Sequence, residues 1–192
     1  MKTNLFQPKI KTKLCTVSAI LIAVASIAGS TLAYFSDNKT AHNVITSGNV
    51  KIELQEWADE NKTTAFKDLE GIMPGMEVTK IAEVKNTGDN TAWIRVQIEK
   101  GFSDMEEVDP SLIVLVTGKK WTAGEDGWYY YTEALAPNAV TDPIFETVQF
   151  AAAMPNEYQN KQAYVNVIAQ AVQTANNGAT VNEALGWPSS EE

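Results

Sequence analysis

Apolar and polar residues alternate with a period of two through much of the chain. In Val50–Glu56 (VKIELQE) and Trp93–Glu99 (WIRVQIE) every second residue is apolar, which is the pattern of a strand with one buried face. Leu112–Val116 (LIVLV) is apolar throughout, and this predicts a strand that is covered on both faces. Further strands are expected where aromatic and β-branched residues gather between turn signals, at Val78–Lys85, Trp128–Thr132, Ile144–Ala151 and Tyr164–Thr174.

Turn-forming sequences separate these apolar runs, for example Pro74-Gly75 and Asn86–Asn90 (NTGDN). About seven strands joined by such turns indicate an antiparallel β-sandwich. No internal repeat and no linker interrupts the pattern, so one all-β domain is expected over residues 34–192. Two short helical pieces are also expected, at Asp104–Val108 and at Val181–Leu185, the second because Thr180 and Glu183 have capping-box spacing.

The first 33 residues differ from the rest of the chain. Residues 1–13 carry four lysines and no acidic residue, and Leu14–Ala33 carries no charge and ends in small residues. This is the pattern of a secretory signal peptide, with cleavage expected between Ala33 and Tyr34. A membrane anchor is the alternative, since twenty uncharged residues could just cross a bilayer. Serine and glycine residues dilute the run, however, and favour the signal peptide.

Cleavage at this position changes the composition. The chain would keep 159 of its 192 residues, with 11 basic and 24 acidic side chains and a net charge of −13. Cys15 would be lost, so no disulfide could form and the exported fold must depend on its core. The negative charge argues against binding to nucleic acid or to anionic membranes. Contact with a membrane is expected only during export.

Candidate catalytic chemistry is sparse. His42 is the only histidine, and it lies in a polar stretch without HExxH spacing. The acidic residues cluster in expected loops, where a solvated surface is the favoured interpretation and weak calcium binding or a glycosidase pair the alternatives. These clusters are Asp59 and Glu60, then Glu106, Glu107 and Asp109, and then Glu125 and Asp126. We therefore assign no catalytic residue, no metal ligand and no cofactor.

The aromatic strand Trp128–Thr132 (WYYYT) must place alternate side chains on opposite faces. At least one of the two pairs, Trp128 with Tyr130 or Tyr129 with Tyr131, is expected to point into the core. The other pair would then pack within or between subunits, or form a platform on which a sugar stacks.

Several motifs resemble the TasA/camelysin family of Gram-positive bacteria. The junction Gly29–Asp37 (GSTLAYFSD), followed by Asn43–Leu54 (NVITSGNVKIEL), is similar to the start of the mature proteins of that family. A central block resembles it in the same order, through Met73-Pro-Gly75, Lys80, Val84–Gly88 (VKNTG) and Trp93–Val96 (WIRV).

The resemblance implies a jelly-roll-like β-sandwich that is secreted after processing by a SipW-type signal peptidase. It also implies a subunit of biofilm-matrix or cell-surface fibres, with copies of the same chain as the main partner and a minor accessory matrix protein as a further one. In such fibres the N-terminal segment of one subunit completes a sheet of the next by donor-strand exchange. Here that segment is Tyr34 to about Ser47, with Tyr34, Phe35, Val44 and Ile45 as its apolar anchors. An ordinary first strand that pairs within its own subunit is the alternative.

The sequence thus predicts a non-enzymatic, extracellular homopolymer. Two other functions remain open. One is a secreted metalloprotease, as the camelysin branch of the family is described, although one histidine is a poor basis for a zinc site. The other is a monomeric module that binds carbohydrate or a surface.

Overall fold

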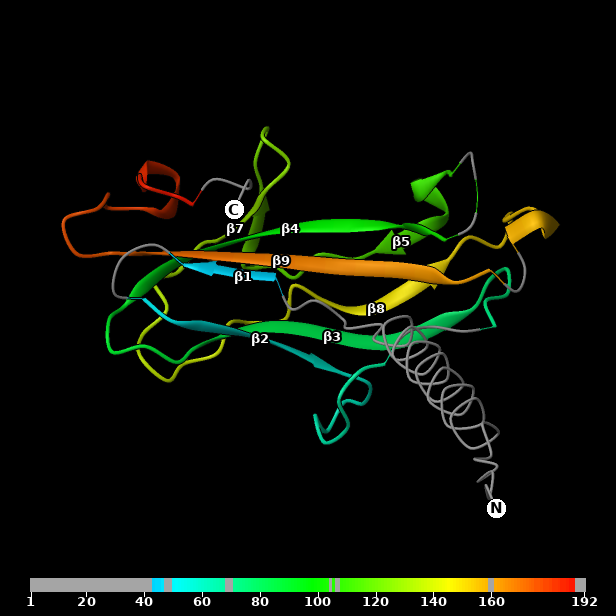
Figure 1. Cartoon of the computed structure of the whole chain (residues 1–192), viewed down its shortest axis with the longest axis horizontal. Coiled ribbons are helices and arrows are strands. Elements are labelled where there is room, and N and C mark those ends of the chain that lie inside the picture. Colours follow the sequence, from blue (N-terminus) through cyan, green and yellow to red (C-terminus); the bar gives the residue numbers. More distant parts are fainter. Residues whose placement is uncertain are drawn as a thin grey trace, which may run out of the picture. The chain divides into compact units, whose positions relative to one another are not determined.

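The computed structural model describes residues 43–46, 50–67, 71–103, 105, 108–158 and 161–188. The expected signal peptide, residues 1–33, and its cleavage point between Ala33 and Tyr34 lie outside these residues. Figure 1 shows the described strands in two layers that pack face to face.

Within the described residues the two layers contain nine strands and three short 3-10 turns. One sheet has the strand order β1-β9-β4-β7-β6 and the other β2-β3-β8-β5. The strands are β1 (Asn43–Thr46), β2 (Ile52–Trp57), β3 (Glu77–Asn86), β4 (Ala92–Phe102), β5 (Ile113–Leu115), β6 (Trp121–Ala123), β7 (Tyr129–Tyr131), β8 (Phe145–Phe150) and β9 (Ala163–Gln173). The 3-10 turns are η1 (Pro110–Leu112), η2 (Asn156–Tyr158) and η3 (Val181–Glu183).

The connections between the strands define the type of sandwich. Only β2–β3 and β6–β7 are neighbours both in sequence and in the same sheet. Every other connection passes from one sheet to the other, so consecutive strands face each other across the core. This is a jelly-roll-like arrangement, and the predicted all-β sandwich is confirmed.

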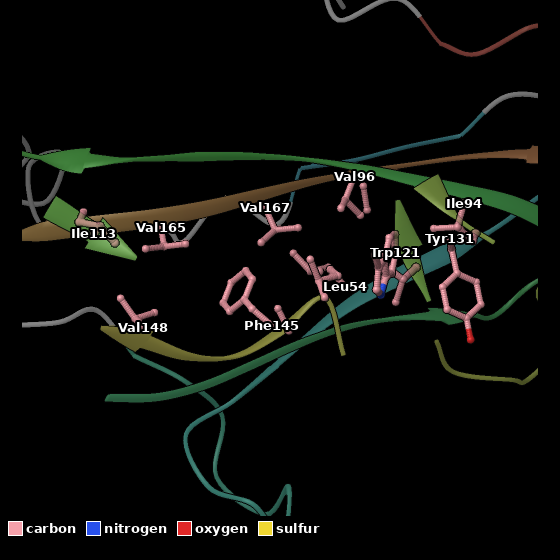
Figure 2. Close-up of a cluster of buried hydrophobic side chains, with 14 of the residues drawn as sticks. Leu54, Ile94, Val96, Ile113, Trp121, Tyr131, Phe145, Val148, Val165 and Val167 are labelled. Atoms are coloured by element: carbon pink, nitrogen blue, oxygen red, sulfur yellow. The ribbon is translucent and has the colours of Figure 1, made fainter. Parts of the chain in front are cut away.

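The core forms where the period-two pattern predicts it. Ile52 and Leu54 of β2 are buried, whereas Glu53 between these two residues is exposed. Ile94 and Val96 of β4 are buried as well. In Figure 2 side chains from both sheets point into the space between the layers. Each such buried aliphatic side chain contributes roughly 1.5–3 kcal/mol through removal of apolar surface from water.

The expectation for Leu112–Val116 is wrong. Strand β5 lies at the edge of its sheet and pairs only with β8. Ile113 is buried in the core, but Val114 is 42% exposed and Val116 is 70% exposed. Within the described residues no layer covers the outer face of β5. A continuous apolar run therefore does not imply a central strand, because composition carries no information about which strands become neighbours.

Of the two short helices expected, only the second lies wholly within the described residues. Residues 104, 106 and 107 of the first lie outside the described part of the chain, and the described turn nearby is η1, capped by the Asp109 carboxylate. The second is the single turn η3. The Glu183 carboxylate accepts a hydrogen bond from the Ala179 N–H at 3.0 Å, but the Thr180 hydroxyl makes no cap bond. Glu183 thus accepts from the residue before the cap and not from Thr180 itself, so the expected capping box does not form.

Candidate functional site

The short strand β1 lies against β9 and runs parallel to it. Its register places Asn43 opposite Ile168 and Thr46 opposite Ala171. All other strand pairs described in the two sheets are antiparallel. In Figure 1 β1 is the short blue strand beside the long orange β9. Since β9 has eleven residues, β1 covers only residues 168–171, in its C-terminal half.

Beyond β1, the edge of β9 is paired with no described strand. Just outside its two ends, the Gln162 carbonyl accepts from the Ser103 N–H, and the Thr174 N–H donates to the Thr91 carbonyl. Hydrogen-bonded and non-bonded positions alternate in an antiparallel pair. The backbone groups of Ala163, Val165 and Val167 therefore point away from β4. No described strand lies beside Ala163 and Val165, and such an edge is a template for a further strand.

A lysine from the opposite sheet reaches this edge. The Lys80 Nζ of β3 donates a hydrogen bond to the Val165 carbonyl at 2.8 Å. The same Nζ lies 2.9 Å from the Glu56 Oε1 of β2, and the two side chains are only 4% and 5% exposed. The Phe66 ring centroid is 4.4 Å from Nζ. Removing an ammonium and a carboxylate from water costs several kcal/mol per ion, and here the ion pair, the carbonyl and the ring offset part of that cost.

The loop after β2 is fastened in a way that positions Phe66. The Phe66 N–H donates to the Glu56 carbonyl at 3.0 Å. Glu83 of β3 accepts from the Trp57 Nε1 at 3.0 Å and forms an ion pair with Lys62. These contacts hold the loop against β3, so the ring remains over the Lys80 ammonium.

The expected donor segment is described only in part. Tyr34 and Phe35 lie outside the described residues. Val44 and Ile45 belong to β1, where their backbones lie opposite Ala169 and Gln170 of the same chain. In the single chain β1 thus pairs with its own β9, and exchange of this strand between copies stays a prediction.

Lys80 and Glu56 were not identified from the sequence as a pair, although a signal is present. Ile52 and Leu54 are buried on alternate positions of β2, and the next position in this alternation is Glu56. On β3, Lys80 belongs to the same set of alternate positions as the buried Ala82 and Val84. Opposite charges at core-facing positions of neighbouring strands are a detectable sign of a buried ion pair.

A second polar cluster lies on the outer face of the first sheet. The Arg95 guanidinium carbon of β4 is 4.2 Å from the Trp128 ring centroid and 4.6 Å from that of Trp187. The Tyr130 hydroxyl donates to the Asp126 Oδ2 at 2.7 Å, and this bond holds the pKa of Asp126 below its ordinary value. Arginine between two indole faces is a stabilising cation–π arrangement.

The contacts of this cluster show which side chains of the aromatic segment Trp128–Thr132 face the core. Tyr131 is buried and Tyr129 packs against the core, so this pair faces inward. Trp128 and Tyr130 lie on the other face, where Arg95 and Trp187 contact them. Their rings are occupied by the protein's own side chains, which weakens the carbohydrate-platform interpretation of this strand.

The acidic loop clusters have local structural roles where they are described. The Ser111 hydroxyl donates to Asp109 and lowers the pKa of that carboxyl. At Asp59 desolvation acts to raise the pKa, but hydrogen bonds from Thr64 and Thr63 outweigh it and the pKa is lowered. Glu106 and Glu107 lie outside the described residues.

The residues fit a metallopeptidase centre poorly. Within the described part of the chain, no group of three or more His, Cys, Asp or Glu side chains lies close enough to hold a metal ion. The single histidine, His42, is outside that part. In the described ranges there is also no helix with the length and apolar content that crossing a bilayer requires.

The fold and its edge define a class of protein: a small jelly-roll-like sandwich whose N-terminal strand lies on the rim of one sheet. The profile of the camelysin metallo-endopeptidase family matches residues 9–109, just over half of the chain, and the chain belongs to this family. The resemblance noted from the junction and central motifs is thereby confirmed. No curated protein and no solved structure gives a significant match to the chain.

Proposed function

We propose that this protein is a secreted, non-enzymatic subunit of extracellular biofilm-matrix or cell-surface fibres. Subunits join head to tail when the freed N-terminal segment, Tyr34 to about Ser47, enters the sheet edge of the next copy. The observation that carries this proposal is the parallel pairing of β1 with only four residues of β9. Membership of the TasA/camelysin family supports it.

The geometry of β1 favours exchange for an energetic reason. Parallel pairs are slightly less stable per residue than antiparallel ones, and a four-residue strand forms few ladder bonds. A strand from a second copy would form the same bonds with the same edge, so exchange loses little. Strand addition to an exposed edge is a recurrent mode of peptide recognition. A contact of this type does not close on itself and therefore generates filaments.

Processing would control the timing of assembly. Before cleavage after Ala33, Tyr34 is an internal residue and cannot thread into a neighbour. A SipW-type signal peptidase would thus act as the switch that releases the donor segment outside the membrane. A minor accessory matrix protein would be the partner at which a filament begins.

Electron microscopy of the exported protein tests the proposal. N-terminal sequencing should first give Tyr34 as the new end. We expect filaments from this form and none from a variant that lacks residues 34–47. The variant can accept a donor strand but cannot supply one, so a small fraction of it should shorten wild-type filaments.

Each opposite result has a distinct meaning. If the exported protein stays monomeric at high concentration and in acid, assembly is the wrong function. If the deletion variant forms the same filaments, assembly stands and the donor mechanism is wrong. Circular dichroism of the deletion variant shows whether it retains the β-sandwich.

The family description makes a metallo-endopeptidase the second candidate. This function requires stoichiometric zinc and cleavage of casein that a chelator abolishes. A loss of both in His42→Ala would support the peptidase. Inactivity of the wild-type protein with added zinc would exclude it under those conditions.

A further inference from the structure

We propose that Lys80 is an edge lock, meaning a side chain that occupies the β9 edge in the isolated subunit and must leave before a donor strand can pair there. The occupant that displaces it is the N-terminal segment of a second copy of this chain. The inference rests on the donor-strand assembly proposed above and adds the residue that regulates its rate.

Lys80 and an incoming donor strand would bind the same carbonyl oxygen, that of Val165. The Val165 carbonyl points away from β4 and accepts from the Lys80 Nζ at 2.8 Å. If a donor continued the parallel register of β1, its residue 40 would lie opposite Val165. The N–H groups of that strand would face the same edge. The Lys80 ammonium and the incoming strand therefore compete for the same position.

The bond also crosses the sandwich. Lys80 belongs to β3 in one sheet and Val165 to β9 in the other. Natural sheets protect their edges with inward-pointing charged residues, among other devices. Lys80 is such a residue, because its side chain is 4% exposed and its ammonium ends on the edge itself.

Glu56 makes release of the lock feasible. A buried ammonium without a partner is strongly disfavoured. After displacement from Val165, the Lys80 Nζ still has the Glu56 carboxylate at 2.9 Å and the Phe66 ring at 4.4 Å. The ion pair thus keeps the released lysine inside the fold, and the barrier to entry is close to the strength of one charged hydrogen bond.

The main test is the lag time of filament formation by the exported protein. The variant Lys80→Met with Glu56→Gln removes the lock and leaves no unpaired buried charge. Replacing a buried ion pair by uncharged residues removes the cost of burying two charges, and circular dichroism should first confirm that the variant folds. We expect its lag to shorten about tenfold, as loss of one charged hydrogen bond implies.

The chain offers a matched control on the same two strands. Lys85 of β3 lies opposite Glu53 of β2, and neither of them is buried. Lys85→Met with Glu53→Gln makes the same chemical change without touching the β9 edge, and its lag should equal that of the wild type. A destabilised core variant, Val84→Ala, separates unlocking from simple loss of stability.

The outcomes distinguish this inference from the proposed function. If wild-type filaments form and the Lys80→Met, Glu56→Gln variant keeps the wild-type lag, the lock is refuted and the fibre function stands. If Val84→Ala shortens the lag equally, the effect is one of stability and the lock is also refuted. If the wild type forms no filaments, the proposed function itself fails.

A direct reading of the contact comes from NMR with ¹⁵Nζ-lysine and ¹³C-carbonyl valine. The through-space coupling between Lys80 Nζ and the Val165 carbonyl should be present in the subunit and absent in the filament. Its persistence in the filament would contradict displacement. Hydrogen exchange adds a second criterion, since the Val165 and Val167 amides should gain protection only on assembly. Protection of both amides in the monomer would instead place the chain's own N-terminal segment at this edge.

Discussion

Arg95 donates two hydrogen bonds to the Gln170 side-chain oxygen, from Nε at 2.9 Å and from Nη2 at 2.7 Å. The pair joins β4 to β9 on the outer face of the first sheet, and Gln170 is fully buried. Trp128 and Trp187 enclose the same guanidinium. One arginine thus connects two central strands with the segment that follows β9.

Substitution of Arg95 should destabilise the fold. Arg95→Ala leaves the buried Gln170 oxygen without its donors and removes the stacking partner of two indoles, so we expect a loss of about 2–3 kcal/mol. Arg95→Lys keeps the charge but not the planar fork, and should recover only part of this loss. Urea unfolding measures both variants. Full recovery by lysine would mean that charge alone matters at this position.

The C-terminal segment should respond to a milder change. Trp187 stacks on Arg95, and its Nε1 donates to the Ala184 carbonyl at 3.0 Å. Trp187→Ala should loosen residues 174–188, at a loss of about 1 kcal/mol, and should speed proteolysis there. Leu185→Ala is the control, because Leu185 is 77% exposed and should be neutral. Equal proteolysis of the two variants would contradict a role for the stacking.

Stability should decline in acid. Bonds from the Tyr131 hydroxyl and Lys120 hold the pKa of Asp142 below its ordinary value of 3.8, and the Tyr130 hydroxyl does the same for Asp126. A carboxyl whose folded pKa is depressed contributes stability that is present above its unfolded pKa and is lost as the pH falls through the folded pKa. Urea midpoints should therefore fall below about pH 4.

Asp142→Asn supplies the check on this acid effect. The variant should be less stable than the wild type at pH 7, and the difference should narrow below pH 4. The exposed Asp89→Asn serves as the control and should follow the wild-type profile. A constant difference between Asp142→Asn and the wild type from pH 7 to pH 3 would show that ionisation of Asp142 does not contribute.

The exposed edge of the second sheet should be a liability of the unassembled subunit. Val116 is 70% exposed beside β5, in an apolar run of high β propensity. Val116→Lys should change the free energy of unfolding by no more than about 0.5 kcal/mol and should reduce amorphous aggregation at high concentration. Val148→Lys, at a fully buried position, is the contrasting variant and should unfold the domain. A Val116→Lys variant that aggregates like the wild type would exclude this edge as the cause.

The sequence predicts the local features well and the long-range ones poorly. Alternation correctly places the buried faces of β2 and β4, because the side-chain period is a local property of an extended backbone. The edge position of β5 and the parallel partner of β1 depend on which distant strands become neighbours. The buried Lys80 and Glu56 are predictable only in part. Their core-facing positions follow from the alternation of each strand, but the Val165 carbonyl that Lys80 contacts is 85 residues away in the sequence.

The parallel direction of β1 gives polarity to any filament built on it. A donor that enters in this register has only one orientation along β9, so every subunit must face the same way. One filament end would then always present an open β9 edge and the other an unpaired N-terminal segment. Growth rates at the two ends would differ, and a single accessory protein specific for one end would be sufficient to set both the starting point and the direction of the fibre.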